Sequence, residues 1–90
     1  MTEEEQLVQM GEDAEAVLNS PAFDRVVNKL VESTFQTFVN SKADEEDLRK
    51  QTYNHYRALV DVVNTLKQHV AVRDEIRAKG DTSQEEGAPS

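Results

Sequence analysis

Residues 44–79 read DEEDLRKQTYNHYRALVDVVNTLKQHVAVRDEIRAK and contain no glycine or proline. Apolar residues recur in this stretch at the spacing of a helix: Tyr56, Leu59, Val63, Leu66 and Val70. The pattern predicts one long helix. At about 1.5 Å per residue the helix spans roughly 50 Å, more than the width of a globule of this chain length. Its apolar stripe therefore needs cover from earlier helices, from a second copy or from a partner.

A second helix is predicted to begin at Pro21 and to end near Asn40. Ser20 can cap it, Pro21 takes the first helical position, where its missing N–H costs nothing, and Asp24 lies in the first turn. The apolar residues of this helix form a wide stripe: Phe23, Val26, Val27, Leu30, Val31, Phe35, Phe38 and Val39. Because a stripe of this width covers more than one neighbour, we expect this helix to be the centre of the core.

A short turn is predicted between the two helices. Asn40 or Ser41 is expected to end the helix that begins at Pro21. Asp44 is the expected N-cap of the long helix, with its side chain reaching Asp47. The carboxylates of residues 44–47 suit the positive end of the helix dipole. We therefore read this acidic cluster as a helix start.

The long helix is predicted to end at Gly80. Basic residues before this glycine suit the negative end of the helix dipole: Arg73, Arg77 and Lys79. The residues that follow are small, polar and acidic, with Gly87 and Pro89 among them. They predict a disordered acidic tail over residues 80–90, after a single helical domain over residues 1–79.

A shorter acidic helix is predicted before Ser20. Thr2 can cap the N–H of Glu5 while Glu5 reaches back. Gly11 lies inside this helix and weakens it by roughly 1 kcal/mol relative to alanine, so its order depends on docking. Its apolar residues follow at spacings of three and four: Leu7, Met10, Ala14, Val17 and Leu18. We expect the docking to come mainly from the larger ones: Leu7, Met10, Val17 and Leu18.

The predicted fold class is all-α, with a helical hairpin of residues 21–40 and 44–79 and the acidic helix beside it. A short turn makes the hairpin helices antiparallel. In one arrangement the acidic helix completes a three-helix bundle, bringing its carboxylates to the basic end of the long helix and covering Leu66, Val70 and Ile76. In the other, this half of the long helix pairs with a second chain in a homo-oligomer. Both arrangements stay open.

The net charge of −8 repels nucleic acid and anionic membranes. Residues 1–20 hold six acidic side chains and no basic one: Glu3, Glu4, Glu5, Glu12, Asp13 and Glu15. We therefore expect protein partners rather than nucleic acid or membrane. The absence of cysteine, an acidic N-terminus unlike a signal peptide, and the lack of a run long enough to cross a bilayer predict a cytoplasmic protein.

Side chains that could carry chemistry are few. His55 and His69 are the only histidines, and they lie about 21 Å apart on the predicted helix, too far to share a metal ion. No phosphate loop, nucleophile elbow or zinc motif occurs, which predicts a non-enzymatic protein without a cofactor or metal. Tyr53 and Tyr56 permit two interpretations, a recognition patch or the edge of a core beside the second helix.

Two stretches resemble a group of small helical proteins that tailed bacteriophages encode among genes for capsid assembly and packaging. They are VLNSPAFDRVVNKLVESTFQTF, residues 17–38, and RALVDVVNTLKQHV, residues 57–70. The resemblance covers roughly residues 16–79. It implies non-enzymatic work in a viral context, with the protein in the host cytoplasm or in the virion. The group has no catalytic motif, so no residue role is carried over.

Three classes of function follow. The favoured one is an interaction or assembly protein that acts through self-association and an apolar helical surface, with candidate residues Leu7, Met10, Val17, Leu66, Val70 and Ile76. The second is an acidic inhibitor in which residues 3–15 and 44–47 imitate the phosphates of nucleic acid. The third is a small DNA-packaging subunit that contacts DNA through a few basic residues: Lys67, Arg73, Arg77 and Lys79.

Overall fold

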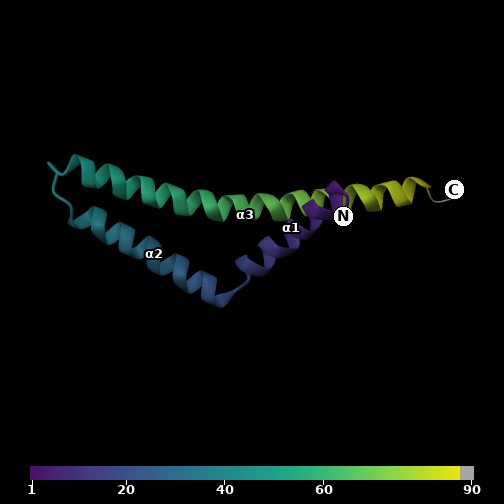
Figure 1. The fold of residues 1–90 in the computed structure, drawn as a ribbon, viewed down its shortest axis with the longest axis horizontal. Coiled ribbons are helices and arrows are strands. Elements are labelled where there is room, and N and C mark those ends of the chain that lie inside the picture. The colour runs from purple at the N-terminus through teal and green to yellow at the C-terminus, as the bar shows by residue number, and fades with distance from the viewer. Residues whose placement is uncertain (88–90) are drawn as a thin grey trace. The chain divides into compact units, whose positions relative to one another are not determined.

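The computed structural model describes the backbone of residues 1–87 and the side chains of residues 1–80. Within these residues the chain forms three helices and no strand: α1 (Glu3–Leu18), α2 (Pro21–Asn40) and α3 (Glu46–Gly87) (Figure 1). The predicted all-α fold is confirmed, as are the bounds expected for α2.

Side chains cap α1 and α2 at the predicted positions. The N–H of Glu5 donates to the hydroxyl of Thr2 at 3.1 Å, and this hydroxyl donates to the Glu5 carboxylate at 3.2 Å. The N–H of Phe23 donates to Ser20 Oγ at 3.3 Å, and Pro21 occupies the first turn. These bonds satisfy N–H groups that the first turn of a helix leaves without backbone partners.

The start of α3 differs from the prediction by one residue. Its N-cap is Glu45 rather than Asp44, since the N–H of Arg49 donates to the carbonyl of Glu45. The Glu45 carboxylate also accepts a hydrogen bond from the N–H of Lys42 at 2.7 Å. This side chain is long enough to close the turn from the N-cap position, which explains the shift.

One predicted helix end is confirmed and another is wrong. Ser41 ends α2, because its N–H and its hydroxyl both donate to the carbonyl of Phe38. The end predicted at Gly80 is wrong, since α3 continues to Gly87. No glycine among the described residues has a positive φ, so Gly80 does not adopt the left-handed conformation that closes many helices. Residues 88–90 of the predicted tail lie outside the described residues.

The chain divides into two compact units, each described here by itself. Unit 1 contains residues 1–18 and the chain from Thr65 onward, and unit 2 contains residues 19–64. The helix α3 contributes its first part, up to Asn64, to unit 2 and its second part to unit 1. The single domain expected over residues 1–79 stays a prediction.

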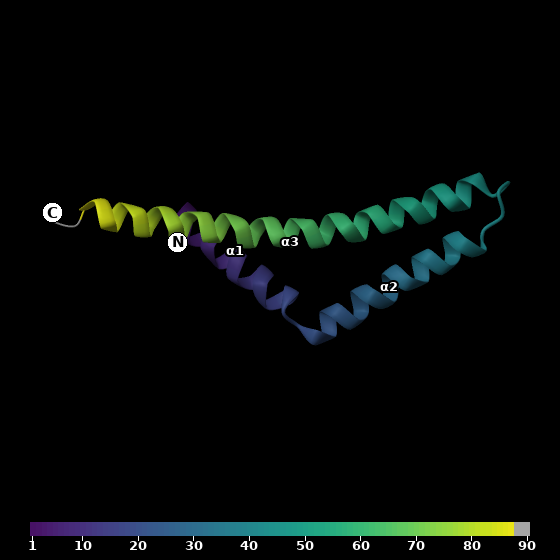
Figure 2. The same ribbon diagram turned by 180° about the vertical axis from the view of Figure 1, so that it is seen from behind.

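Unit 2 is an antiparallel helical hairpin. The helix α2 and the first part of α3 are joined by the turn at residues 41–45 (Figures 1 and 2). No residue of α2 is fully buried. The expectation that α2 is the centre of a core is therefore wrong, because its stripe is wide enough for two neighbours and unit 2 supplies one.

In unit 1, α1 crosses the second part of α3 and runs in the opposite direction (Figures 1 and 2). Gly11 and Ala14 are buried at this crossing. Ala14, which is 2% exposed, is the one buried hydrophobic side chain among the described residues. Large apolar side chains consequently stay exposed in both units.

We predict that Ser20→Ala lowers the free energy of unfolding by about 1 kcal/mol, because the N–H of Phe23 loses its acceptor at the start of α2. Urea unfolding followed by circular dichroism measures the change. Ser33→Ala is the control, because Ser33 is exposed in the middle of α2, where alanine is the better helix former. An equal loss in the two variants would show that Ser20 does not act as a cap.

Candidate functional site

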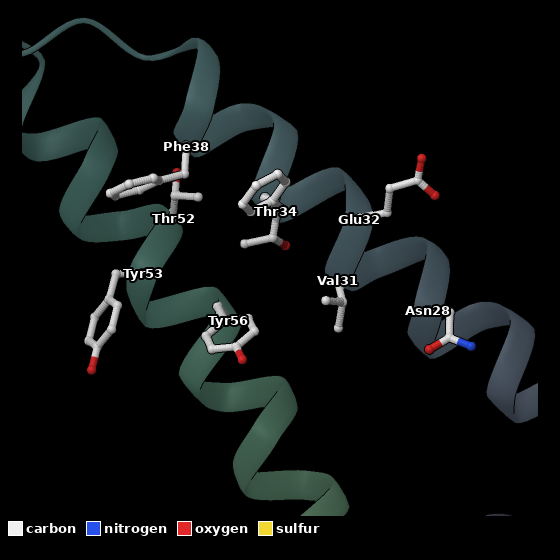
Figure 3. A pocket seen from close by; sticks show the side chains of 9 residues that line it. Asn28, Val31, Glu32, Thr34, Phe38, Thr52, Tyr53 and Tyr56 are labelled. Carbon is white, nitrogen blue, oxygen red and sulfur yellow. The ribbon is translucent and has the colours of Figure 1, made fainter.

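A cleft with aromatic walls opens between α2 and the first part of α3 in unit 2. Its volume is about 600 Å³, within the range of ligand pockets. Figure 3 shows the side chains that line it, which are Asn28, Val31, Glu32, Thr34, Phe35 and Phe38 from α2 and Thr52, Tyr53 and Tyr56 from α3. Four of the five aromatic residues of the chain belong to this set. We call the site the aromatic cleft.

Two threonines lie between the aromatic cleft and a smaller polar recess, because Thr34 and Thr52 line both. Thr52 is 5% exposed. Its hydroxyl donates to the carbonyl of Leu48 at 2.7 Å, and the hydroxyl of Thr34 donates to the carbonyl of Leu30 at 2.8 Å. Because each hydroxyl is satisfied within its own helix, neither threonine needs a polar partner across the hairpin.

Arg49 lies over one aromatic ring of the cleft. Its guanidinium carbon is 4.6 Å from the centre of the Phe38 ring, which is within the range of cation–π attraction. Arg49 Nε is buried and has no hydrogen-bond partner among the described residues. The ring face therefore partly replaces the water that this guanidinium loses, and Phe38 is restrained beside the cleft.

The other aromatic side chains of the cleft are largely open to solvent. Phe35 is 61% exposed, Tyr53 57% and Tyr56 42%. Such exposure favours a recognition patch over a core edge for the two tyrosines. Glu32 is the one charged residue among those that line the cleft. The lining therefore suits contact with an apolar surface and lacks a paired acid and base.

The histidines lie away from the aromatic lining. His55 is exposed beside the polar recess, which Ser33 and Thr37 also line, and His69 is half-buried in unit 1. Among the described residues, no group of three or more histidine, aspartate or glutamate side chains is placed to hold a metal ion.

In unit 1, Gly11 permits a close approach of α1 to α3. A Cβ atom added at Gly11 would overlap the Cβ of Arg73 and would lie 2.7 Å from the carbonyl oxygen of His69. Neither atom is the end of a flexible side chain that could move aside. The glycine therefore weakens α1 as an isolated helix and at the same time makes its docking possible.

Two ion pairs join α1 to α3. Arg73, which is 5% exposed, donates to Glu15 and Asp74 at 2.9 Å each, and Arg77 pairs with Glu12. The pKa of Glu15 is lowered by the hydrogen bond from Arg73 and then by the charge of Arg73, and the pKa of Arg73 is raised by its hydrogen bonds to Glu15 and Asp74. Of the two arrangements considered for α1, the structure shows the acidic helix against the basic end of α3.

The predicted apolar surface is only partly used in this crossing. Three of its residues lie half-buried on α3: Leu66, Val70 and Ile76. The three on α1 are exposed by 37%, 49% and 39%, in this order: Leu7, Met10 and Val17. The closest contact of the helices runs through Gly11 and Ala14, whose small size lets the backbones approach. The docking role expected of the larger apolar residues of α1 stays a prediction.

The predicted acidic surface is divided between paired and exposed residues. Glu12 and Glu15 form ion pairs with α3. Asp13 accepts a hydrogen bond from Gln9 at 3.0 Å. The remaining acidic residues are exposed in the first turn of α1: Glu3, Glu4 and Glu5.

Apolar periodicity predicts a core rather than a site for the aromatic residues on the α2 wall of the cleft. A signal for the site exists in the sequence. Phe35 and Phe38 precede the turn, and Tyr53 and Tyr56 follow it at comparable distances. A hairpin brings such residues to the same level, so the clustering was derivable once the hairpin was assumed.

Comparisons of the chain with protein-family models, curated proteins and solved structures give no match. The resemblance to small phage proteins therefore stays a hypothesis. In the described part of the chain, no helix has both the length and the apolar composition that crossing a membrane requires.

We predict opposite effects for alanine at two helical glycines. Gly80→Ala should stabilise α3 by up to about 1 kcal/mol, because nothing lies within 4 Å of the added Cβ. Gly11→Ala should destabilise the protein, because overpacking costs about 1–3 kcal/mol and outweighs the gain in helix propensity. Thermal unfolding followed by circular dichroism measures both. Stabilisation by Gly11→Ala would contradict the close crossing of α1 and α3.

We predict that the docking of α1 weakens in acid through Glu15. Because the pKa of Glu15 is lowered in the folded state, its contribution to stability is complete above its ordinary value of 4.5 and is lost as the pH falls through the lower, folded value. Glu15→Gln should therefore reduce stability near neutral pH and reduce it progressively less in acid. Urea unfolding at a series of pH values measures this difference.

Asp13→Asn removes the same charge from α1 without touching Arg73, and it serves as the control. Its stability should follow the pH dependence of the wild type. If Glu15→Gln also kept the wild-type pH dependence, the Glu15–Arg73 pair would have no part in docking α1.

Proposed function

We propose that the protein is a non-enzymatic interaction protein whose aromatic cleft holds an apolar surface of another protein chain. The observation that supports this most directly is the set of four aromatic side chains gathered in one cleft and exposed by 39% to 61%. Aromatic side chains dominate the energetics of protein interfaces. Leaving most of the chain's aromatic residues in water is unfavourable unless a partner covers them.

The aromatic cleft can contribute a large part of the free energy that association requires. Four aromatic side chains that each bury 150–250 Å² when covered, and that are about half exposed here, offer roughly 400 Å² of new burial. At about 25 cal/mol per Å² this corresponds to about 10 kcal/mol before any costs. Association costs an estimated 4–15 kcal/mol. The aromatic cleft can therefore supply much of the driving force, with the surrounding rims supplying the rest.

The inhibitor and DNA-packaging alternatives have less support. Two of the carboxylates considered for imitation of nucleic acid, Glu12 and Glu15, are engaged by arginines of the same chain. Of the basic residues considered for contact with DNA, Arg73 is 5% exposed and is held by Glu15 and Asp74, while Arg77 and Lys79 form exposed ion pairs. An interaction surface built from apolar side chains accounts for more of the described structure than either.

Site-specific photocrosslinking in the native host tests the proposal. We predict that a benzoylphenylalanine at Tyr53 forms covalent adducts with protein. The same probe at Val62 is the control, because Val62 is similarly exposed, 54% against 57% for Tyr53, but lies nine residues away and so on the opposite face of α3. It should give few or no adducts.

The mass of each adduct distinguishes the possible partners. Adducts of Tyr53 with any protein chain, its own or another, support the proposed function. Absence of adducts at Tyr53, or equal adducts at Tyr53 and Val62, would contradict it.

A further inference from the structure

We infer that the chain seated in the aromatic cleft is a second copy of this protein, so that two unit 2 hairpins pair cleft to cleft as an antiparallel four-helix arrangement. This inference rests on the proposed function of the aromatic cleft. In the pairing, α2 of each copy lies against the first part of α3 of the other. The two copies are related by a two-fold axis parallel to the helices, so each supplies the same surface.

The charges along the two rims of the cleft support a second copy. On α2, Asp24 and Glu32 lie on the face that carries Phe35. Glu32 is eight residues after Asp24 and three residues before Phe35. On α3, Lys50 and Arg57 flank Tyr53 at spacings of three and four residues. Arg25 lies seven residues before Glu32 and Glu46 lies four residues before Lys50, so each rim carries charges of both signs. A two-fold axis parallel to the helices sets α2 of each copy against α3 of the other, which lets Glu32 of one copy meet Arg57 of the other.

The levels of Glu32 and Arg57 along the helices agree with this pairing. Arg49 lies over Phe38, which fixes the level of α2 against α3. Glu32 lies six residues before Phe38 on α2. Because the helices are antiparallel, it is level with the position six residues after Arg49 on α3, which is position 55. Arg57 is two residues further, or about 3 Å along the axis. The proposed axis leaves levels unchanged, so Glu32 of one copy faces Arg57 of the other.

The basic group at this position is accessible to a second carboxylate. Arg57 pairs with Asp61 at 3.3 Å on the same helix, and the two side chains are 53% and 62% exposed. Exposed pairs of this kind contribute little, so the guanidinium can be shared with an incoming Glu32. Burial beside the aromatic rings strengthens the new contact, because less water screens it.

The net charge of the chain does not oppose this contact. Residues 19–64 carry seven carboxylates and six basic side chains, a net charge of −1. Most of the −8 of the chain therefore lies outside unit 2. Two copies of unit 2 meet with almost no net repulsion, and salt screens the rest of the chain over about 8 Å at physiological ionic strength.

The aromatic cleft supplies about half of the area that a standard dimer interface buries. The four aromatic side chains offer roughly 400 Å² per copy, about half of the 800 Å² per partner of a standard interface. Val39, which is 55% exposed, lies four residues after Phe35 on the same face and adds to this area. The rims supply the remainder.

The first test is the mass of the purified full chain in solution, measured by light scattering over a wide range of concentration. We expect twice the monomer mass of 10.2 kDa at the higher concentrations. Phe35→Glu should raise the dissociation constant by about tenfold or more. Val26→Glu is the matched control, because Val26 is 58% exposed against 61% for Phe35 and lies on the opposite face of α2. It should remain a dimer, and circular dichroism confirms that both variants stay folded.

The second test exchanges the charges of the rims. Glu32→Arg and Arg57→Glu each set like charges against one another in both halves of a homodimer, so each variant alone should dissociate more readily. An equimolar mixture of the two variants should form a heterodimer, in which both pairs are again opposite in charge. Restoration on mixing shows that the contact is between copies, which a fold defect within one chain would not produce.

The outcomes separate this inference from the function on which it rests. A wild-type chain that stays monomeric at every concentration, a dimer indifferent to Phe35→Glu, or no heterodimer on mixing would overturn the second copy. In each of these cases, an adduct between position 53 and a different protein would leave the proposed function standing. If position 53 formed no adduct with any protein, both the second copy and the proposed function would be contradicted.

Discussion

The structure depends on one constraint, which is that a helix as long as α3, 42 residues, cannot cover its own apolar stripe. Its first part has α2 beside it in unit 2, and its second part has α1 across it in unit 1. One neighbour covers only one side of a helix. Large side chains of all three helices therefore remain in water, and among residues 1–80 the one buried hydrophobic side chain is Ala14 at the α1 crossing. The hydrophobic effect then favours further association.

The two units meet this constraint by different means. Unit 1 brings two backbones close through Gly11 and Ala14 and adds ion pairs around them, with Arg73 almost fully covered. Such a contact is short, and a cleft of about 470 Å³ opens beside it between the first part of α1 and Ile76. Unit 2 packs two threonines between its helices and leaves the aromatic side chains on one flank. The contact in unit 1 docks α1 on α3. The contact in unit 2 leaves an aromatic surface that is suited to bind another protein chain.

Sequence reasoning reached the helices because their starts depend on local chemistry. The Thr2 and Ser20 caps and the position of Pro21 require no knowledge of tertiary structure. The part that Gly11 plays in docking α1 was missed for the opposite reason. Apolar periodicity selects Ala14 together with Leu7 and Met10, but the close crossing depends on the small size of Gly11, which a hydrophobic pattern does not reveal.

The remaining errors have the same origin. Gly80 is a helix stop only if its backbone turns left-handed, and nothing in the local sequence compels it to do so. The stripe of α2 was read as core because width predicts burial. Whether a wide stripe is covered by the same chain or by another depends on how many neighbours the fold supplies. That number is a property of the tertiary arrangement, and sequence spacing alone does not contain it.

The central claim is that a second copy of the chain covers the aromatic cleft. The chain has no tryptophan, and its two tyrosines both line the cleft, so intrinsic fluorescence reports on this site alone. The most direct measurement is the quenching of tyrosine fluorescence by acrylamide as the concentration of the purified chain is raised. The account predicts that quenching falls steeply over the range in which the mass doubles. Quenching that stays at the level of exposed tyrosine at every concentration, while the mass doubles, would contradict it.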